Sequence, residues 1–221
     1  RYGNISDGTQ FCAGSLIAPD VIATAAHCVE DIESFNGKIK VAVGVSTLSS
    51  IKNTIRVTRM VKHPNWNKQT IDSDIALLFL EKSVANITSV PVIKKENDFL
   101  NSTNARAQLN ALPESSAGFA ADETCMMAGW GKTNDSSNPR PNNLQSLSMP
   151  IVPQNACASK MKERTAHDVT ENMFCAGTAD LQGGPSHGDS GGPLVLHAKN
   201  GQPVLAGIVS WGASSCTNAY G

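Results

Sequence analysis

At positions 72–80 the chain reads Asp72-Ser73-Asp74-Ile75-Ala76-Leu77-Leu78-Phe79-Leu80, an acidic segment followed by a strongly apolar run. The apolar run has the length of a β-strand and is far shorter than the roughly 20 residues that a membrane-spanning helix needs. An ionised carboxylate at the entrance of a buried strand needs a hydrogen-bonding partner, and an imidazole N–H is such a partner. The segment therefore predicts a buried strand, with a partner for Asp74 elsewhere in the chain.

Short β-branched or alternating runs recur along the chain. They occupy residues 21–25, 39–45, 54–61, 124–130, 144–151, 193–196 and 204–211. Helical periodicity is poor: residues 153–162 favour a short helix, and residues 26–32 favour a single turn. A polar stretch over residues 94–123 is typical of a connection between two β units. We predict an all-β protein with two domains, residues 1–113 and 114–221, that meet near Pro113.

The composition excludes several classes of protein. The 221 residues are 40% hydrophobic, which is enough to bury a full core. Lys and Arg total 18 against 19 Asp and Glu, so the net charge is -1. This balance argues against a nucleic-acid partner and against a cationic membrane-binding surface. The apolar runs are strand-sized, so we expect no membrane partner either.

Cysteines and sequons indicate where the protein works. The six cysteines include no Cys-x-x-Cys pair, which fits disulfides better than a metal site. The segment Arg1-Tyr2-Gly3-Asn4 has no apolar run, so the sequence is mature, processed or truncated. Asn-x-Ser/Thr sequons begin at Asn4, Asn86, Asn101 and Asn134. Together these signals predict an extracellular, secreted glycoprotein.

Three glycines surround one hydroxyl in the segment Gly188-Asp189-Ser190-Gly191-Gly192-Pro193. Glycine permits positive φ and close backbone approach, so a tight turn here can expose Ser190. Such a turn can also aim the amides of Gly188 and Ser190 at one point, where an oxyanion would be stabilised. Taken alone, the segment is also compatible with a Gly-rich hairpin that contains an incidental serine.

His27 follows an apolar strand in the segment Thr24-Ala25-Ala26-His27-Cys28. Its small neighbours would let the imidazole lie against the backbone. A lone histidine at a strand end is more often a surface or core residue than a catalytic base. Asp74 favours a functional role for His27, because the carboxylate of Asp74 needs an N–H donor and an imidazole can supply one.

The order His27, Asp74, Ser190 resembles that of the chymotrypsin-like (trypsin-like) serine peptidase family. Further segments that resemble family signatures, in the family's order, are residues 11–17, 128–131, 172–177 and 209–212. The resemblance covers nearly the whole chain. It implies two six-stranded antiparallel Greek-key β-barrels of the chymotrypsin type, with the active site in the cleft between them.

The resemblance also implies an activity, a secreted serine endopeptidase that forms an acyl-enzyme. Ser190 would be the nucleophile, His27 the general base and Asp74 the residue that orients the imidazole. The amides of Gly188 and Ser190 would form the oxyanion hole. Asp189 resembles the carboxylate that a newly cut N-terminus neutralises. Polypeptide substrates and protein protease inhibitors are the implied partners of a monomer that needs no cofactor and no metal.

Residues that would bind substrate follow from the same resemblance. Ser210, Trp211 and Gly212 resemble the strand that pairs with the substrate backbone. Gly184, six residues before Ser190, takes the position that sets primary specificity, and Gly212 and Gly221 resemble the pocket walls. A glycine in place of an aspartate predicts a preference for large apolar residues. Alternatively, the unusual residues 185–187 reshape this loop, and the analogy fails.

The chain departs from the family pattern at both ends. It has no Ile-Val-Gly-Gly segment before Cys12 and no final strand or C-terminal helix after Gly221. We interpret the sequence as a fragment that lacks both ends. As an entire mature protein it would leave Asp189 without its cationic partner. Tyr220 resembles a position found in sodium-binding members, which is a weak signal, and nothing suggests a calcium site.

The cysteines fit the family only in part. The resemblance implies two disulfides, Cys12–Cys28 and Cys157–Cys175. The family partners of the remaining two cysteines fall at Leu196 and Ser186, so Cys125 and Cys216 are expected to be free thiols. A bridge between Cys125 and Cys216 is conceivable, but the family does not make it.

Two other functions compete with the peptidase. The segment around Ser190 also fits the Gly-x-Ser-x-Gly elbow of α/β-hydrolases, but that fold places its acid and histidine after the serine, and only His197 follows Ser190. A non-catalytic homologue that binds or regulates other proteins is the stronger rival, because the pocket disulfide and the activating terminus are missing. The complete His27, Asp74 and Ser190 set favours the enzyme.

Overall fold

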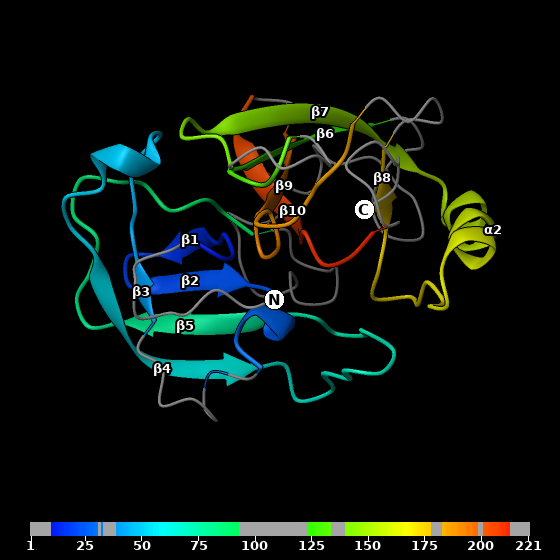
Figure 1. The fold of residues 1–221 in the computed structure, drawn as a ribbon, viewed down its shortest axis with the longest axis horizontal. Helices are drawn as coiled ribbons and strands as arrows, with labels where there is room; N and C mark the ends of the chain where they lie inside the picture. Colours follow the sequence, from blue (N-terminus) through cyan, green and yellow to red (C-terminus); the bar gives the residue numbers. More distant parts are fainter. Residues whose placement is uncertain are drawn as a thin grey trace, which may run out of the picture.

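The computed structural model describes residues 10–30, 32, 39–92, 123–133, 140–177, 183–198 and 201–212. These residues form two antiparallel sheets of five strands each (Figure 1). They contain a single α-helix, α2 (Gln154–Arg164), which lies beside the second sheet. The predicted all-β, two-barrel fold is confirmed, and the described residues supply five of the six strands expected in each half.

The first sheet is built around the apolar run at residues 75–80. The run forms β5 (Ala76–Leu80), which lies between β2 (Val21–Thr24) and β4 (Ile55–Lys62). Alternate side chains of β5 are buried, as expected when one face of a strand meets the core. The sheet is completed by β1 (Ser15–Ala18) beside β2 and by β3 (Lys40–Val41) beside β4.

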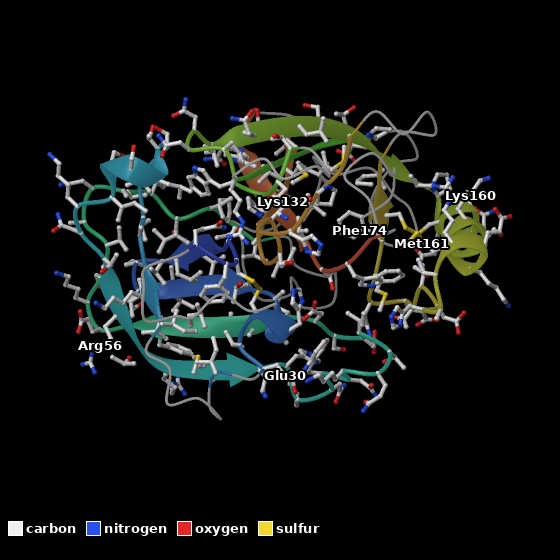
Figure 2. The ribbon with its side chains drawn as sticks, viewed as in Figure 1. Glu30, Arg56, Lys132, Lys160, Met161 and Phe174 are labelled. Carbon is white, nitrogen blue, oxygen red and sulfur yellow. A yellow bond between two sulfur atoms is a disulfide. The ribbon has the colours of Figure 1, made fainter. Side chains whose placement is uncertain are left out.

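The second sheet has the order β10-β9-β6-β7-β8. Its strands are β6 (Thr124–Gly129), β7 (Gln145–Val152), β8 (Cys175–Ala176), β9 (Pro193–His197) and β10 (Pro203–Ile208). Its core contains two methionines, Met127 and Met149, which pack with Leu194 and Leu196. Met161 of α2 packs separately against the Cys157–Cys175 disulfide (Figure 2).

Both implied disulfides, Cys12–Cys28 and Cys157–Cys175, are present. Cys125 is unpaired and fully buried, and burial raises the pKa of its thiol to about 11. Leu196, which takes the place of its family partner, is fully buried in the same core. Apolar packing therefore occupies the place of a disulfide. Cys216 lies outside the described residues.

Two predicted strands are shorter than expected. The strand predicted over 39–45 ends at Val41, and Gly44 beyond it has φ of 72°, which turns the chain out of the sheet. The strand predicted over 204–211 ends at Ile208, because Val209 bonds instead to the turn around Ser190, through the amide of Gly191 (2.8 Å) and the carbonyl of Gly192 (2.9 Å). The strand patterns in the sequence do not indicate β1 or β8.

The domain boundary predicted at Pro113 lies outside the described residues and remains a prediction. No helix in the described ranges is long and apolar enough to cross a membrane. The two sheets are joined by backbone hydrogen bonds between loops: the amide of Leu48 donates to Asn142 (2.8 Å), and the amide of Leu144 donates to Ser46 (2.7 Å).

Candidate active site

His27 lies on a short 3₁₀ turn, Ala26–Cys28, that directly follows β2. Ala25 and Ala26 are fully buried, and Cys28 is tied to Cys12 by a disulfide. β2 and β5 are antiparallel, with Thr24 opposite Ala76, so the end of β2 and the start of β5 lie together. The sheet register therefore brings His27 next to Asp74.

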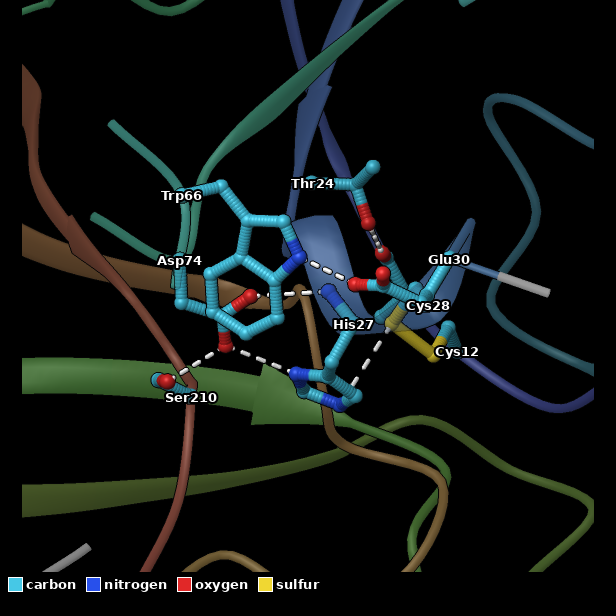
Figure 3. A network of polar contacts seen from close by, with 9 residues as sticks. Cys12, Thr24, His27, Cys28, Glu30, Trp66, Asp74 and Ser210 are labelled. Carbon is cyan, nitrogen blue, oxygen red and sulfur yellow. Dashed lines mark hydrogen bonds and ion pairs between the residues drawn. A yellow bond between two sulfur atoms is a disulfide. The ribbon is translucent and has the colours of Figure 1, made fainter. Parts of the chain in front are cut away.

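Asp74 contacts His27 through both of its carboxylate oxygens (Figure 3). Oδ2 lies 2.7 Å from Nδ1 of the imidazole, and Oδ1 accepts the backbone N–H of His27 at 2.8 Å. The hydroxyl of Ser210 donates to Oδ2 at 2.5 Å. The side chain of Asp74 is 3% exposed and that of His27 is 34% exposed, so a buried carboxylate holds an imidazole that reaches solvent.

The protonation of Asp74 follows from these contacts. Burial is the largest single influence and acts to raise the pKa of Asp74. The hydrogen bond and charge of His27 and the hydrogen bond from Ser210 outweigh it, so the pKa lies below its usual value. The carboxylate is therefore ionised at neutral pH and accepts the proton on Nδ1. This tautomer leaves Nε2 with a lone pair that can accept a proton.

The loop that presents Asp74 has an unfavourable backbone. Ile71 and Ser73 have φ of 57° and 56°, in the left-handed region. For residues other than glycine such conformations cost on the order of 1–3 kcal/mol each, and Ile71 is β-branched. Surrounding contacts must therefore hold this loop in place.

The turn around Ser190 has the backbone that its glycines predicted. Gly188 and Gly191 have φ of 107° and 78°. Gly191 also packs so closely against Ala13 and Thr24 that a side chain there would overlap them. The turn is therefore available only to glycine at these positions.

Backbone contacts fix the Ser190 turn to the half of the protein that carries His27. The amide of Ala13 donates to the carbonyl of Ser190 at 2.8 Å. The hydroxyl of Thr24, three residues before His27, donates to the carbonyl of Ala13 at 2.8 Å. Within the described residues no hydrogen bond joins the Ser190 hydroxyl to His27, whose Nε2 lies 3.8 Å from Sγ of Cys28. The structure thus links the two segments through Ala13.

Asp189 is 7% exposed, and its carboxylate lies between the loop that follows β6 and the segment just before Ser190. Its oxygens accept the amides of Gly131 (2.7 Å) and Ser186 (3.0 Å). Side chains at Gly129 or Gly131 would overlap its carboxylate. In the part of the chain that the structure describes, Asp189 has no ion pair, and its carboxylate is hydrogen-bonded by these backbone amides instead.

Three of the predicted substrate-binding residues, Gly184, Ser210 and Trp211, line cavities. Gly184, Asp189 and Lys132 line a cavity of about 220 Å³. Ser210 and Trp211 line another of about 200 Å³, together with His27, Glu30, Trp66, Lys68 and Ile71. Gly212 is exposed, and Gly221 and Tyr220 lie outside the described residues. One candidate metal-ligand group, Cys12, His27 and Cys28, has its two sulfurs in a disulfide, which removes them as thiolate ligands.

Several contacts at the site were not predicted from the sequence. Trp66 donates its indole N–H to Glu30 beside His27 (Figure 3), and Gln10 donates to the carbonyl of Gly188 at 2.7 Å. Asp72 contacts Thr170, 98 residues away. Asp72 is the first residue of the segment that predicted a partner for Asp74, but no periodicity or motif indicates the residues that these side chains reach.

Comparison with known proteins agrees with the geometry. Residues 3–221 match the family model described as Trypsin. Trypsin of Sus scrofa is 34% identical over 95% of this chain and 77% of its own length, and trypsin of Xenopus laevis is 34% identical over 98% and 76%. Trypsin Blo t 3 of Blomia tropicalis is 33% identical over 96% of this chain and 71% of its own length. The chain therefore belongs to the trypsin-like family of serine peptidases.

Proposed function

We propose that this chain is an active serine endopeptidase in which Ser190 attacks the substrate, His27 acts as general base and Asp74 orients the imidazole. The observation that carries the proposal is the pair of contacts from Asp74 to His27: the one with Nδ1 favours the tautomer needed for proton transfer, and the one with the backbone N–H holds the two residues together. The hydrogen bond from Ser210 to the same carboxylate supports it.

The proposed reaction begins when Oγ of Ser190 bonds to the carbonyl carbon of the scissile peptide and gives its proton to Nε2 of His27. The carbonyl oxygen becomes an oxyanion, which the amides of Gly188 and Ser190 stabilise, each such donor contributing about 3 kcal/mol. The C–N bond then breaks, and His27 returns the proton to the leaving amine. Water hydrolyses the acyl-enzyme by the same route.

Primary specificity is proposed to favour large apolar residues. Gly184 brings no carboxylate to its cavity, and the carboxylate of Asp189, which lines the same cavity, already accepts the amides of Gly131 and Ser186. Lys132 lines the same cavity, and its ammonium repels the side chains of Lys and Arg. Both features favour Phe, Tyr, Leu or Met at the residue before the cleaved bond.

One experiment tests reactivity and specificity together. The full-length protein is treated with two peptide phosphonates that differ only in carrying a Phe-like or an Arg-like side chain. We expect covalent modification at Ser190 by mass spectrometry, no modification of Ser190→Ala, and faster reaction with the Phe-like probe. No modification by either probe would contradict the activity and favour the non-catalytic homologue. Faster reaction with the Arg-like probe would contradict only the specificity.

Two observations favour the rival function, a non-catalytic binding or regulatory protein. Asp189 lacks an ion pair within the described ranges, and Nε2 of His27 makes no hydrogen bond there to Ser190. The complete set of reactive side chains favours the enzyme, because a binding protein has no need for all three. As part of the proposed peptidase function, we expect a monomer that acts on polypeptide substrates and binds protein protease inhibitors.

An extracellular location is proposed from the disulfides and from Asn86, the one sequon asparagine in the described residues, which is exposed. Expression in a eukaryotic secretory cell should give protein in the medium that loses mass on treatment with an N-glycosidase. Substituting Asn86→Gln should remove one glycan, with Asn65→Gln as an exposed control outside any sequon. Unchanged mass in the Asn86→Gln variant would rule out this acceptor.

A further inference from the structure

Asp72 lies two residues before Asp74 in the loop that enters β5. Its backbone carbonyl accepts the amide of Asn67 at 3.1 Å, which closes the loop on itself. Its neighbours Ile71 and Ser73 both have positive φ, so Asp72 sits between two residues in a left-handed conformation. The position of Asp74 depends on what holds this part of the loop.

The carboxylate of Asp72 reaches across to the half of the protein that carries the second sheet. The hydroxyl of Thr170 donates to Oδ1 at 2.5 Å. The side-chain amide of Asn172 lies 3.2 Å from each carboxylate oxygen. Both partners lie between α2 and β8, so these hydrogen bonds join the first sheet's loop to the second half.

The partner segment is itself fixed. The carbonyl of Thr170 accepts the side chain of Gln154 at 3.0 Å and the amide of Met173 at 3.1 Å. The hydrogen bond from Thr170 is the largest influence that lowers the pKa of Asp72, so the acceptor is ionised at neutral pH. A charged acceptor makes stronger hydrogen bonds than a neutral one.

We propose that Asp72 is a positioning residue for the reaction: its hydrogen bonds to Thr170 and Asn172 hold the loop that aims Asp74 at His27. This inference rests on the proposed peptidase function. Positive φ is unfavourable for Ile71 and Ser73, so both residues would leave this conformation if the hydrogen bonds of Asp72 were removed. Such a change at residues adjacent to Asp72 and Asp74 would move the carboxylate from its two contacts on His27.

The test uses the full-length enzyme with active sites counted by phosphonate titration. Asp72→Ala should lower kcat per titrated site by about 10-fold, with KM nearly unchanged, because misorientation of a catalytic group affects the transition state more than substrate binding. Asp72→Asn keeps one carbonyl oxygen for Thr170 and should recover most of kcat. Glu171→Gln neutralises an exposed carboxylate between the two partners and should leave kcat unchanged.

Variants on the other side of the contact make the test independent of how Asp72→Ala folds. Thr170→Val and Asn172→Ala should each lower kcat in the same sense, and the double variant Asp72→Ala with Thr170→Val should lose less than the product of the single losses. An unchanged kcat per titrated site in Asp72→Ala and Thr170→Val, with only fewer titratable sites, would show a merely structural role and overturn the inference. A wild type that no phosphonate labels would instead overturn the proposed function, and this inference with it.

Discussion

Replacing His27 by alanine is expected to lower kcat by about 10⁶-fold. In the proposed mechanism the imidazole is the base for Ser190 and later the acid for the leaving amine, so its removal stops both proton transfers. Residual turnover would come from substrate binding and from the amides of Gly188 and Ser190. Single-turnover kinetics with an activated ester and with a peptide would measure it.

A matched control separates chemistry from folding in this experiment. His63→Ala removes a second exposed imidazole in the same half of the protein and should leave kcat within about twofold, because surface substitutions rarely alter the rest of a structure. The phosphonate should fail to label His27→Ala and should still label His63→Ala. A His27→Ala variant that retains wild-type turnover would eliminate the proposed mechanism.

Substituting Asp74→Asn is expected to lower kcat by about 10⁴-fold, the loss known when an amide replaces the carboxylate of a serine peptidase triad. An amide at this position can present its N–H groups to Nδ1 and favour the tautomer in which Nε2 carries the proton. That tautomer cannot accept the proton of Ser190. The hydrogen bond from Ser210 would also lose its charged acceptor.

The same substitution should change how stability depends on pH. The folded pKa of Asp74 lies below its ordinary value of 3.8, so its contribution to stability is complete above that value and disappears as the pH falls through the folded pKa. Wild-type stability should therefore fall on acidification below about pH 4 more steeply than that of Asp74→Asn. Urea midpoints between about pH 3 and pH 7 would measure the difference, with Glu163→Gln on α2 as a control in which an exposed carboxylate is neutralised. Parallel curves for wild type and Asp74→Asn would contradict this role for the carboxylate.

Sequence patterns predicted the parts of this protein that depend on local chemistry. The apolar run predicted the strand β5, and the need of Asp74 for a donor predicted the contact between Asp74 and His27. The glycines around Ser190 predicted its tight turn, because positive φ at Gly188 and Gly191 is a local backbone property. The strands β4, β6 and β7 lie within a residue or two of the predicted ranges.

Other contacts between distant residues could not be predicted in this way. Thr170 and Asp72 are 98 positions apart, and polar side chains of this kind also occur on ordinary exposed loops. Val209 continues an apolar pattern that predicted a longer β10, but its hydrogen bonds go to Gly191 and Gly192. In the first case the partner is set by how the two halves meet, and in the second by the turn around Ser190 that precedes β9. Hydrophobic periodicity carries no information on either arrangement.

The bond between the amide of Ala13 and the carbonyl of Ser190 uses main-chain atoms alone. Evolution can therefore exchange the side chain at position 13 within steric limits without deleting the link, since every residue except proline supplies the same N–H. An inserted or deleted residue between Ala13 and Thr24 would instead shift which amide faces the carbonyl of Ser190. Lineages descended from this sequence should accordingly tolerate substitutions in that segment far better than changes in its length.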